Sequence, residues 1–278
     1  MKTGYLITAR LKSERLKEKI LLDLNGKAIL DHVIERCKAT KGIDRVVLCT
    51  STNNQDSRLR DFAEKHNIDF FAGSEDDVLL RLKNAAIENK IDNFLSITAD
   101  NPLVSVYLSE LFLEWSQKNS LNFGRVFGLP VGLTPYFLNS AALDIAVKMK
   151  QNHDTEIWGP FVFREDFFKI GYYKVNGCVI PEKERLTCDY PDDYEFLQIV
   201  LRQIQSDRTP DIFDLMHYYE NNESVFQLSR IHSQRSLSVS EKNKIRAAFD
   251  KAKETGYAYA RKLGVTLQPG LLQKTITL

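Results

Sequence analysis

The chain has few cysteines, and none of them has a spacing typical of a metal site or a disulfide framework. Four cysteines are spread over 278 residues, with no C-x-x-C arrangement and no paired histidines beside them. The pattern argues against a zinc site and against a disulfide-stapled fold, and it indicates small buried thiols in a reducing compartment. They are Cys37, Cys49, Cys178 and Cys188.

Long apolar runs and an excess of one charge are absent as well. No run approaches the roughly 18 apolar residues that a membrane-spanning helix needs, and the first apolar stretch is too short for a secretory signal. Lys and Arg total 38 against 37 Asp and Glu, a net charge of +1, so no global positive field recruits nucleic acid. We expect a cytoplasmic enzyme or binding protein with no membrane insertion and no nucleic-acid partner.

The first half of the chain alternates strand-like and helix-like segments. Strands separated by helices imply right-handed crossovers and a mainly parallel sheet covered on both faces. The predicted fold class is therefore α/β, with three layers (α/β/α) around a mainly parallel mixed sheet. The predicted strands are 5–8, 45–49, 68–71 and 93–98, and the predicted helices are 29–38, 55–66, 76–89 and 106–117.

The second half is less regular. Residues 238–262 form a charged, Ala-rich amphipathic helix that Ser238 caps, and Gly264 and Pro269 are expected to end regular structure. We divide the chain into a domain at 1–232 and a helical extension at 233–278, which packs on the domain or docks a second copy in a homodimer. The other predicted strands are 122–127, 167–175 and 185–188, and the other predicted helices are 139–149, 192–205, 211–219 and 224–228.

A cationic segment directly follows the first predicted strand. In open α/β proteins, ligands bind beyond the carboxyl ends of the strands, where backbone N–H groups and cations converge. A run of charges is also common on a solvated loop, but this position at a strand end favours a phosphate site. Its polar residues are Arg10, Lys12, Ser13, Arg15, Lys17 and Lys19.

Two aspartates follow other predicted strands. Asp100 stands in ITADNP after the fourth strand, where an aspartate either supports a turn or binds Mg²⁺. Asp189 follows the short strand at 185–188 and comes too early to cap the next helix, a role that suits Asp192 or Asp193. Two carboxylates at strand ends and a cationic loop suit metal-assisted transfer at a nucleoside triphosphate.

Five sequence blocks, in order, resemble the cytidylyltransferases of the spore-coat polysaccharide F type, relatives of the CMP-ketodeoxyoctonate and CMP-sialic acid synthetases. The blocks are ITARLKSERLKEKILLDLNGK, IDRVVLCTS, AGSEDDVLLRLKNAA, ITADNPLV and ERLTCDYPDDYEFL. The resemblance covers about residues 4 to 232. It implies a Rossmann-like (GT-A) nucleotide-diphospho-sugar transferase fold, and transfer of CMP from CTP to an acidic sugar or related acid for surface polysaccharide synthesis, with release of pyrophosphate.

The resemblance also implies roles for matching positions. Mg²⁺ would lie on Asp100 and Asp189, and Asp100 would join Arg10, Arg15 and Lys19 as the catalytic set. Glu75 or Asp77 would approach the base or only favour a helix start. The nucleotide-binding positions are Ala9, Arg10, Ser13 and Lys19 for the triphosphate, and Thr50, Ser51, Gly73 and Ser74 for the base and ribose.

The chain departs from the family pattern at two places. Lys17 and Glu18 replace the usual Pro-Gly before Lys19. Thr134-Pro135-Tyr136 replaces the acidic residues of G-L-D-x-E, in a region that should line the acceptor pocket. Trp158 nearby is either core or a stacking platform, and His153 with Glu156 is too weak a pair to indicate a metal site. The alternatives left open are another nucleoside triphosphate, a phosphorylated small-acid acceptor, glycosyl transfer, and nucleotide binding without turnover.

Overall fold

An eight-stranded mixed sheet forms the centre of the protein in a computed structural model that describes residues 1–152, 154–204, 209–234 and 236–278. Its order is β10-β9-β7-β8-β6-β1-β4-β5. β8 runs antiparallel to β6 and β7, and the other pairings are parallel, so the remaining strands end at one common edge. The strands are β1 (Thr3–Thr8), β4 (Arg45–Ser51), β5 (Asp69–Gly73), β6 (Asn93–Thr98), β7 (Phe123–Phe127), β8 (Tyr136–Asn139), β9 (Lys169–Asn176) and β10 (Gly270–Thr277).

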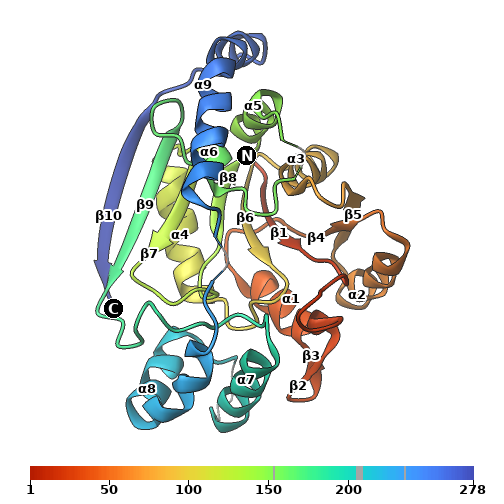
Figure 1. Ribbon diagram of the computed structural model, residues 1–278, viewed down its shortest axis with the longest axis vertical. Coiled ribbons are helices and arrows are strands. Elements are labelled where there is room, and N and C mark those ends of the chain that lie inside the picture. The colour runs from red at the N-terminus through yellow and green to blue at the C-terminus, as the bar shows by residue number, and fades with distance from the viewer. Residues whose placement is uncertain (153, 205–208, 235) are drawn as a thin grey trace.

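Helices cover both faces of this sheet, as the predicted three-layer fold requires (Figure 1). One apolar core contains residues of α1, α2, α4, α7 and α8, and the other contains residues of α3, α5, α6 and α9. The helices are α1 (Ile29–Ala39), α2 (Leu59–His66), α3 (Val78–Glu88), α4 (Val106–Lys118), α5 (Ser140–Met149), α6 (Gly159–Val162), α7 (Pro191–Gln203), α8 (Ile212–Asn222) and α9 (Val239–Lys262).

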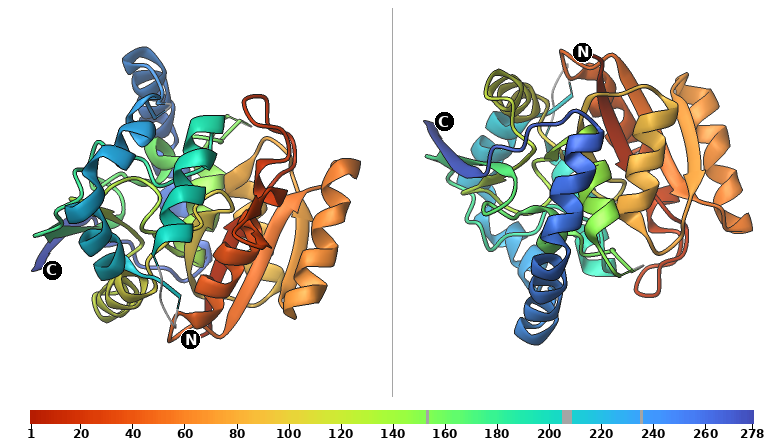
Figure 2. Two further views of the ribbon diagram at one scale, coloured as in Figure 1. Left: turned by 90° about the horizontal axis from the view of Figure 1, so that it is seen from below. Right: turned by 90° about the horizontal axis from the view of Figure 1, so that it is seen from above.

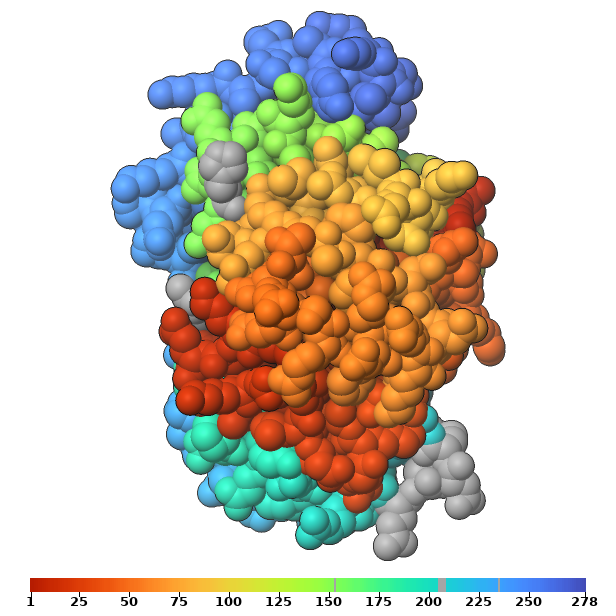
Figure 3. Space-filling model, turned by 90° about the vertical axis from the view of Figure 1, so that its right-hand side faces the viewer, coloured from red at the N-terminus to blue at the C-terminus, as the bar shows by residue number. Residues whose placement is uncertain are grey.

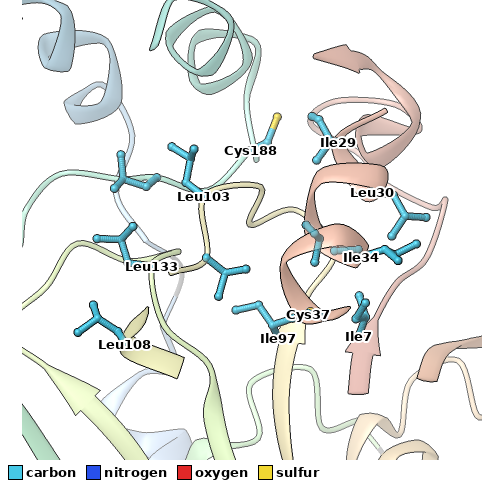
Figure 4. Close-up of a cluster of buried hydrophobic side chains, with 14 of the residues drawn as sticks. Ile7, Ile29, Leu30, Ile34, Cys37, Ile97, Leu103, Leu108, Leu133 and Cys188 are labelled. Atoms are coloured by element: carbon cyan, nitrogen blue, oxygen red, sulfur yellow. The ribbon is translucent and has the colours of Figure 1, made fainter. Parts of the chain in front are cut away.

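The strand period of two explains how one strand serves both cores. On β1, Ile7 points to the first core and Leu6 to the second. Figure 4 shows Ile7 beside Ile97 of β6, facing Ile34 and Cys37 of α1. Burying a side chain of this size stabilises the fold by about 1.5–3 kcal/mol. The packing fixes the carboxyl ends of β1 and β6 next to each other, which positions the segments that follow both strands.

The structure confirms most of the elements predicted in the first half. β6 and α4 begin where the sequence predicts, and α1 ends one residue later than predicted, at Ala39. The predicted helix at 55–66 is divided into a 3-10 helix, Asn54–Arg58, and α2. A short hairpin, β2 (Asp23–Leu24) with β3 (Lys27–Ala28), surrounds the turn at 25–26.

Two predictions in the second half were wrong, and one strand was missed. Residues 185–188 do not form a strand, because Arg185 makes a single bridge to Val131. β8 was not predicted as a separate strand. Regular structure does not end at Gly264 and Pro269, because β10 pairs with β9 along its whole length. The predicted helix end at Gln205 lies outside the described residues, as does His153.

The C-terminal segment joins the sheet edge opposite β5. In both views of Figure 2, β10 and the orange α2–β5 region lie on opposite sides of the molecule. Ser238 caps α9, as predicted, since its hydroxyl accepts the Glu241 N–H at 3.2 Å. Phe249 of α9 packs against Phe167, with ring centroids 5.4 Å apart. Among the described helices, none combines the length and apolar character needed to cross a bilayer.

Candidate active site

A pocket of about 380 Å³ opens at the common carboxyl edge of the parallel strands. The segment after β1, residues 10–19 (the N-terminal bend), forms much of its wall. Figure 3 shows the N-terminal part of the chain, in red, between the orange surface of the α2 and α3 region and the teal surface of α7. The predicted site residues that line this pocket are Ala9, Arg10, Ser13, Arg15, Lys19, Asp100 and Asp189.

The side chain of Lys19 joins the two predicted metal ligands. Its ammonium donates to Asp100 Oδ2 at 2.5 Å and to Asp189 Oδ1 at 2.7 Å, although these residues lie 81 and 170 positions away in the chain. The Cys188 N–H donates to the carbonyl of Asp100 at 2.8 Å and ties the two acidic segments together. The fold therefore brings the two aspartates to one point, as the sequence predicted.

Neighbouring groups fix the carboxylate of Asp189. Arg185 donates to its Oδ2 at 3.0 Å, and Arg15 donates to its Oδ1 at 2.7 Å. Burial acts to raise the pKa of Asp189, but the Lys19 ammonium and these two guanidinium groups lower the pKa to about 2. The side chain of Asp189 is therefore ionised at neutral pH. Asp193 accepts the N–H of Asp189 at 2.8 Å and that of Tyr190 at 3.0 Å, which agrees with the capping role predicted for it.

Lys19 is likewise held in its charged form. Burial acts to lower its pKa, but the carboxylates of Asp100 and Asp189 raise it above the usual value. The side chains of Lys19, Asp100 and Asp189 are only 12%, 17% and 10% exposed. A cation consequently occupies the space between two largely buried carboxylates.

These two carboxylates fit a magnesium site. Mg²⁺ prefers hard oxygen ligands and is usually held by one or two carboxylates, with water and substrate phosphates completing its shell. Asp100 and Asp189 already place oxygens around one positive charge. No group of three or more His, Cys, Asp or Glu side chains suited to a metal occurs among the described residues. The pair therefore suits an ion that arrives with a phosphate ligand better than a permanently bound structural ion.

The outer cations of the bend are paired in exposed ion pairs. Arg10 contacts Glu156 at 2.7 Å, with side chains 32% and 47% exposed, and Lys12 contacts Glu75 at 3.1 Å. Exposed pairs of this kind contribute about 0–1 kcal/mol. A triphosphate with several negative charges can therefore displace these carboxylates at little cost.

Glu18 explains how the bend keeps its turn without the family's glycine. Its φ of 46° and ψ of 31° are left-handed, a conformation that costs most residues roughly 1–2 kcal/mol and glycine little. The carboxylate of Glu18 also forms an ion pair with Arg58. The chain thus retains the backbone geometry of a glycine turn while it anchors the bend to the 3-10 helix before α2.

The predicted base-binding residues lie outside the wall of the pocket. Thr50 and Ser51 are 0% and 2% exposed at the end of β4. The Ser51 hydroxyl donates to Asp56 Oδ2 at 2.5 Å, and the Ser74 hydroxyl accepts the Asp77 N–H at 3.2 Å. Gly73 ends β5, and its carbonyl accepts the Thr52 N–H at 2.9 Å. The role of these four residues toward a base stays a prediction.

The sequence did not single out Arg81, which also lines the pocket. This guanidinium is 3% exposed and donates to the carbonyls of Ser74 and Glu75 at 2.7 and 3.1 Å. A lone arginine within the apolar face of VLLRL is the one signal that could have revealed it. Asp77, by contrast, caps α3 through the Leu80 N–H at 3.1 Å, one of the two roles predicted for an acid at this helix start.

Comparisons with known proteins identify the family of this chain. Residues 5–268 match the cytidylyltransferase family. An uncharacterized protein of Methanocaldococcus jannaschii is 29% identical over 85% of this chain and 98% of its own length. The spore coat polysaccharide biosynthesis protein SpsF of Bacillus subtilis is 24% identical over 75% of this chain and 89% of its own.

Among solved structures, a cytidylyltransferase from Leptospira borgpetersenii superposes with a TM-score of 0.74 and 25% identity, covering 85% of this chain and 100% of its own. The family match spans the five blocks from which the resemblance was inferred and confirms the prediction of a nucleotidyltransferase. The superposition confirms the predicted fold class. The chain therefore belongs to the cytidylyltransferase family.

Proposed function

We propose that this protein transfers CMP from CTP to a small acidic acceptor and releases pyrophosphate. The observation that carries the proposal is the single ammonium of Lys19 bonded to both Asp100 and Asp189 in the pocket. Buried opposite charges at a strand edge are costly to assemble and are typical of sites that bind a charged ligand. The relation to SpsF favours an acceptor destined for a surface polysaccharide, and the similarity to a 3-deoxy-manno-octulosonate cytidylyltransferase favours an acidic sugar.

The reaction is an in-line displacement at phosphorus. An oxygen of the acceptor attacks the α-phosphorus of CTP, the bond to the β-phosphate oxygen breaks, and pyrophosphate leaves with those electrons. The acceptor loses its proton to solvent when the attacking group is a hydroxyl. Such a reaction asks the protein mainly for alignment and for neutralisation of charge.

The N-terminal bend supplies the positive charge for this step. Arg10, Arg15 and Lys19 would exchange their carboxylate partners for phosphate oxygens when the triphosphate binds. Ionic contacts that tighten as charge develops on the leaving group are each worth about 10²–10³ in rate. Ser13 and the backbone at Ala9 would complete the phosphate cradle, and the Gly73–Ser74 turn with Thr50 and Ser51 would face the base.

Asp100 and Asp189 would hold Mg²⁺. When bound, the ion neutralises the phosphate oxygens and withdraws electron density from the phosphoryl group. The protein contributes the fixed positions of the two carboxylates. Arg185 holds Asp189 from the side away from Lys19, and the backbone bond from Cys188 to Asp100 keeps the two segments together.

A pyrophosphate-release assay tests the proposal. The protein is incubated with Mg²⁺, with CTP, UTP, GTP or ATP in turn, and with a panel of acidic sugars and phosphorylated small acids. We expect release only with CTP, only with an acid acceptor, and none in EDTA. Release with UTP, GTP or ATP but not with CTP would refute the base preference. Tight CTP binding with no release under any acceptor would instead indicate a nucleotide-binding protein without turnover.

A further inference from the structure

Tyr190, the residue directly after Asp189, carries stacked groups on both faces of its ring. The His232 ring covers one face, with ring centroids 3.6 Å apart and planes inclined by 13°. The Cζ of Arg15 lies over the Tyr190 ring, 4.9 Å from its centre. A ring stacked as closely as His232 leaves no room beside it, so the guanidinium of Arg15 lies on the other face. The stack therefore ends at a cation that lines the nucleotide pocket.

The place of Tyr190 in the chain indicates that its ring is not required for the start of α7. Tyr190 is the N-cap of this helix, a position at which Ser, Thr, Asp and Asn are preferred. Asp193 provides the capping carboxylate instead and accepts the Tyr190 N–H at 3.0 Å. A local preference that is broken without a gain for the helix is typical of a functional position. We therefore look to the pocket for the role of the ring.

His232 reaches Tyr190 from a distant part of the chain. Residues 231–234 (the connecting segment) follow the 3-10 helix Glu223–Arg230 and lead from the α8 side of the molecule toward α9 (Figure 1). The His232 Nε2 lies 2.9 Å from Oδ2 of Asp192, and Gln234 Oε1 accepts from Arg185 at 2.5 Å. The connecting segment is therefore fixed along residues 185–192, which include Asp189.

A buried carboxylate anchors the start of the connecting segment. Glu184 is 0% exposed, and it accepts from the Ser229 hydroxyl at 2.7 Å and from Arg230 Nε at 2.6 Å. Removing one partner of a buried charge is strongly destabilising, so the fold retains these contacts. His232, two residues after Arg230, consequently gives the Tyr190 ring a fixed surface to pack against.

Arg15 needs a support that persists when the ligand binds. Its side chain is 39% exposed, against 12% for Lys19, and it pairs with Asp189 at 2.7 Å. In the proposed function Asp189 turns to Mg²⁺, so this pairing is weakened. A stacked ring occupies the face of a guanidinium, whereas the N–H donors lie in its plane. The donors of Arg15 can therefore pass from Asp189 to a phosphate oxygen while Tyr190 keeps the side chain in place.

We propose that Tyr190 and His232 are positioning residues for the triphosphate, and that their stacked rings hold Arg15 in its binding orientation before CTP arrives. This inference rests on the proposed function, in which Arg15 binds phosphate. A long side chain that is already restrained loses less conformational entropy on binding, and this raises affinity without a new contact to the ligand. The connecting segment thereby contributes to CTP affinity although it lies outside the wall of the pocket.

A double-mutant cycle tests the proposal. The Kd for CTP in Mg²⁺ is measured by calorimetry for the wild type, Tyr190→Leu, Arg15→Gln and the double variant. We expect Tyr190→Leu to weaken binding about fivefold, from the lost restraint, and Arg15→Gln to weaken it about tenfold or more, from the lost charge-assisted bonds. The double variant should bind within about twofold of Arg15→Gln, because the ring acts through Arg15.

Two further variants separate stacking from other effects of the substitutions. Tyr190→Phe keeps the ring and should restore CTP binding to within about twofold of the wild type, whereas His232→Ala should weaken it about threefold. Melting temperatures show whether each variant folds. Where Tyr190→Leu does not fold, His232→Ala combined with Arg15→Gln completes the cycle.

Phe70→Leu is the matched control, because Phe70 also lies beneath an arginine, 4.3 Å from the Cζ of Arg60, and neither residue lines the pocket. It should leave the Kd for CTP unchanged. Normal binding by Tyr190→Leu, His232→Ala or Arg15→Gln would overturn the assignment, as would losses that multiply in the double variant. Failure of the wild type to bind CTP would instead refute the proposed function itself.

Discussion

Two clusters, each made of two acidic and two basic side chains, have similar ion-pair distances but lie in different parts of the molecule. The pocket cluster consists of Arg15, Lys19, Asp100 and Asp189, with contacts of 2.5 to 2.7 Å. The tail cluster joins the segment before β9 to α9, with contacts of 2.6 to 3.2 Å. It consists of Arg164, Asp166, Asp250 and Lys253.

Burial separates the two clusters. The acids of the pocket cluster are 17% and 10% exposed, and those of the tail cluster are 40% and 45% exposed. Charges removed from water interact strongly and cost much to desolvate, whereas exposed pairs contribute little. Packing of Phe249 and Gly256 holds α9 on the domain, and the tail charges add to an already formed contact. In the pocket cluster, by contrast, we expect a charged ligand to replace some of these ion-pair partners when it binds.

Asp100→Asn should have the largest effect of any change in either cluster. The substitution preserves shape and removes one charge from the pair around Lys19, so CTP-dependent pyrophosphate release should fall about 10²–10³-fold. Steady-state release at saturating CTP and Mg²⁺ measures it. The melting temperature should stay within a few degrees of the wild type, because Asp189 still pairs with Lys19. Normal turnover by a folded variant would remove Asp100 from the proposed site.

Gly256→Ala in α9 should destabilise the protein more than the removal of any one charge of the tail cluster. A Cβ at this position would meet Met149 Sδ at 2.4 Å and Phe167 Cζ at 2.8 Å. Overpacking costs about 1–3 kcal/mol, which exceeds the gain of up to about 1 kcal/mol in helix propensity. Urea unfolding should therefore show net destabilisation, while turnover of the folded enzyme is unchanged. The exposed neighbour Thr255→Ala reports propensity alone and should be neutral or stabilising. Equal effects of both changes would contradict the packing argument.

The fold was predictable from sequence where local pattern and burial coincide. Asn93–Thr98 is an apolar run between polar segments, and β6 has those bounds. β10 was missed because LLQKTIT is mostly exposed and places three polar residues in a row, and only pairing with β9 makes it a strand. β8 was missed because its four residues lead directly into α5.

The same limit applies to the site. The bend and Asp100 were predictable because they follow strands that end at one edge of the sheet. Asp189 was placed beside them on the strength of a predicted strand, 185–188, that the structure does not form. Thr50 and Ser51 also end a strand, but whether a side chain there faces the pocket or the interior depends on its three-dimensional neighbours.

The destabilisation caused by Asp189→Asn should depend on pH, because it removes the buried charge of Asp189. Because the folded pKa of about 2 lies below the unfolded value near 3.9, ionised Asp189 stabilises the fold above about pH 4, and this stability is lost as pH falls toward 2. The destabilisation caused by the substitution should fall from about 2 kcal/mol at pH 6 to about 1 kcal/mol at pH 2.5. Urea titrations at both pH values measure it. An equal destabilisation at both would show that the carboxylate gains no stability from its charge.

Among these variants, Asp250→Asn should have the smallest effect on stability and turnover, because it changes an exposed pair of the tail cluster. Its carboxylate accepts from Arg164 at 2.6 Å, but the side chain is 45% exposed, so the pair contributes about 0.2–1 kcal/mol. Asp166 continues to pair with Arg164 at 2.9 Å after the change. We expect a small loss of stability in urea that shrinks in 1 M salt, because a Debye length near 3 Å screens exposed charges. Turnover should be unchanged. A loss above about 2 kcal/mol would mean that charge, and not packing, holds α9 on the domain.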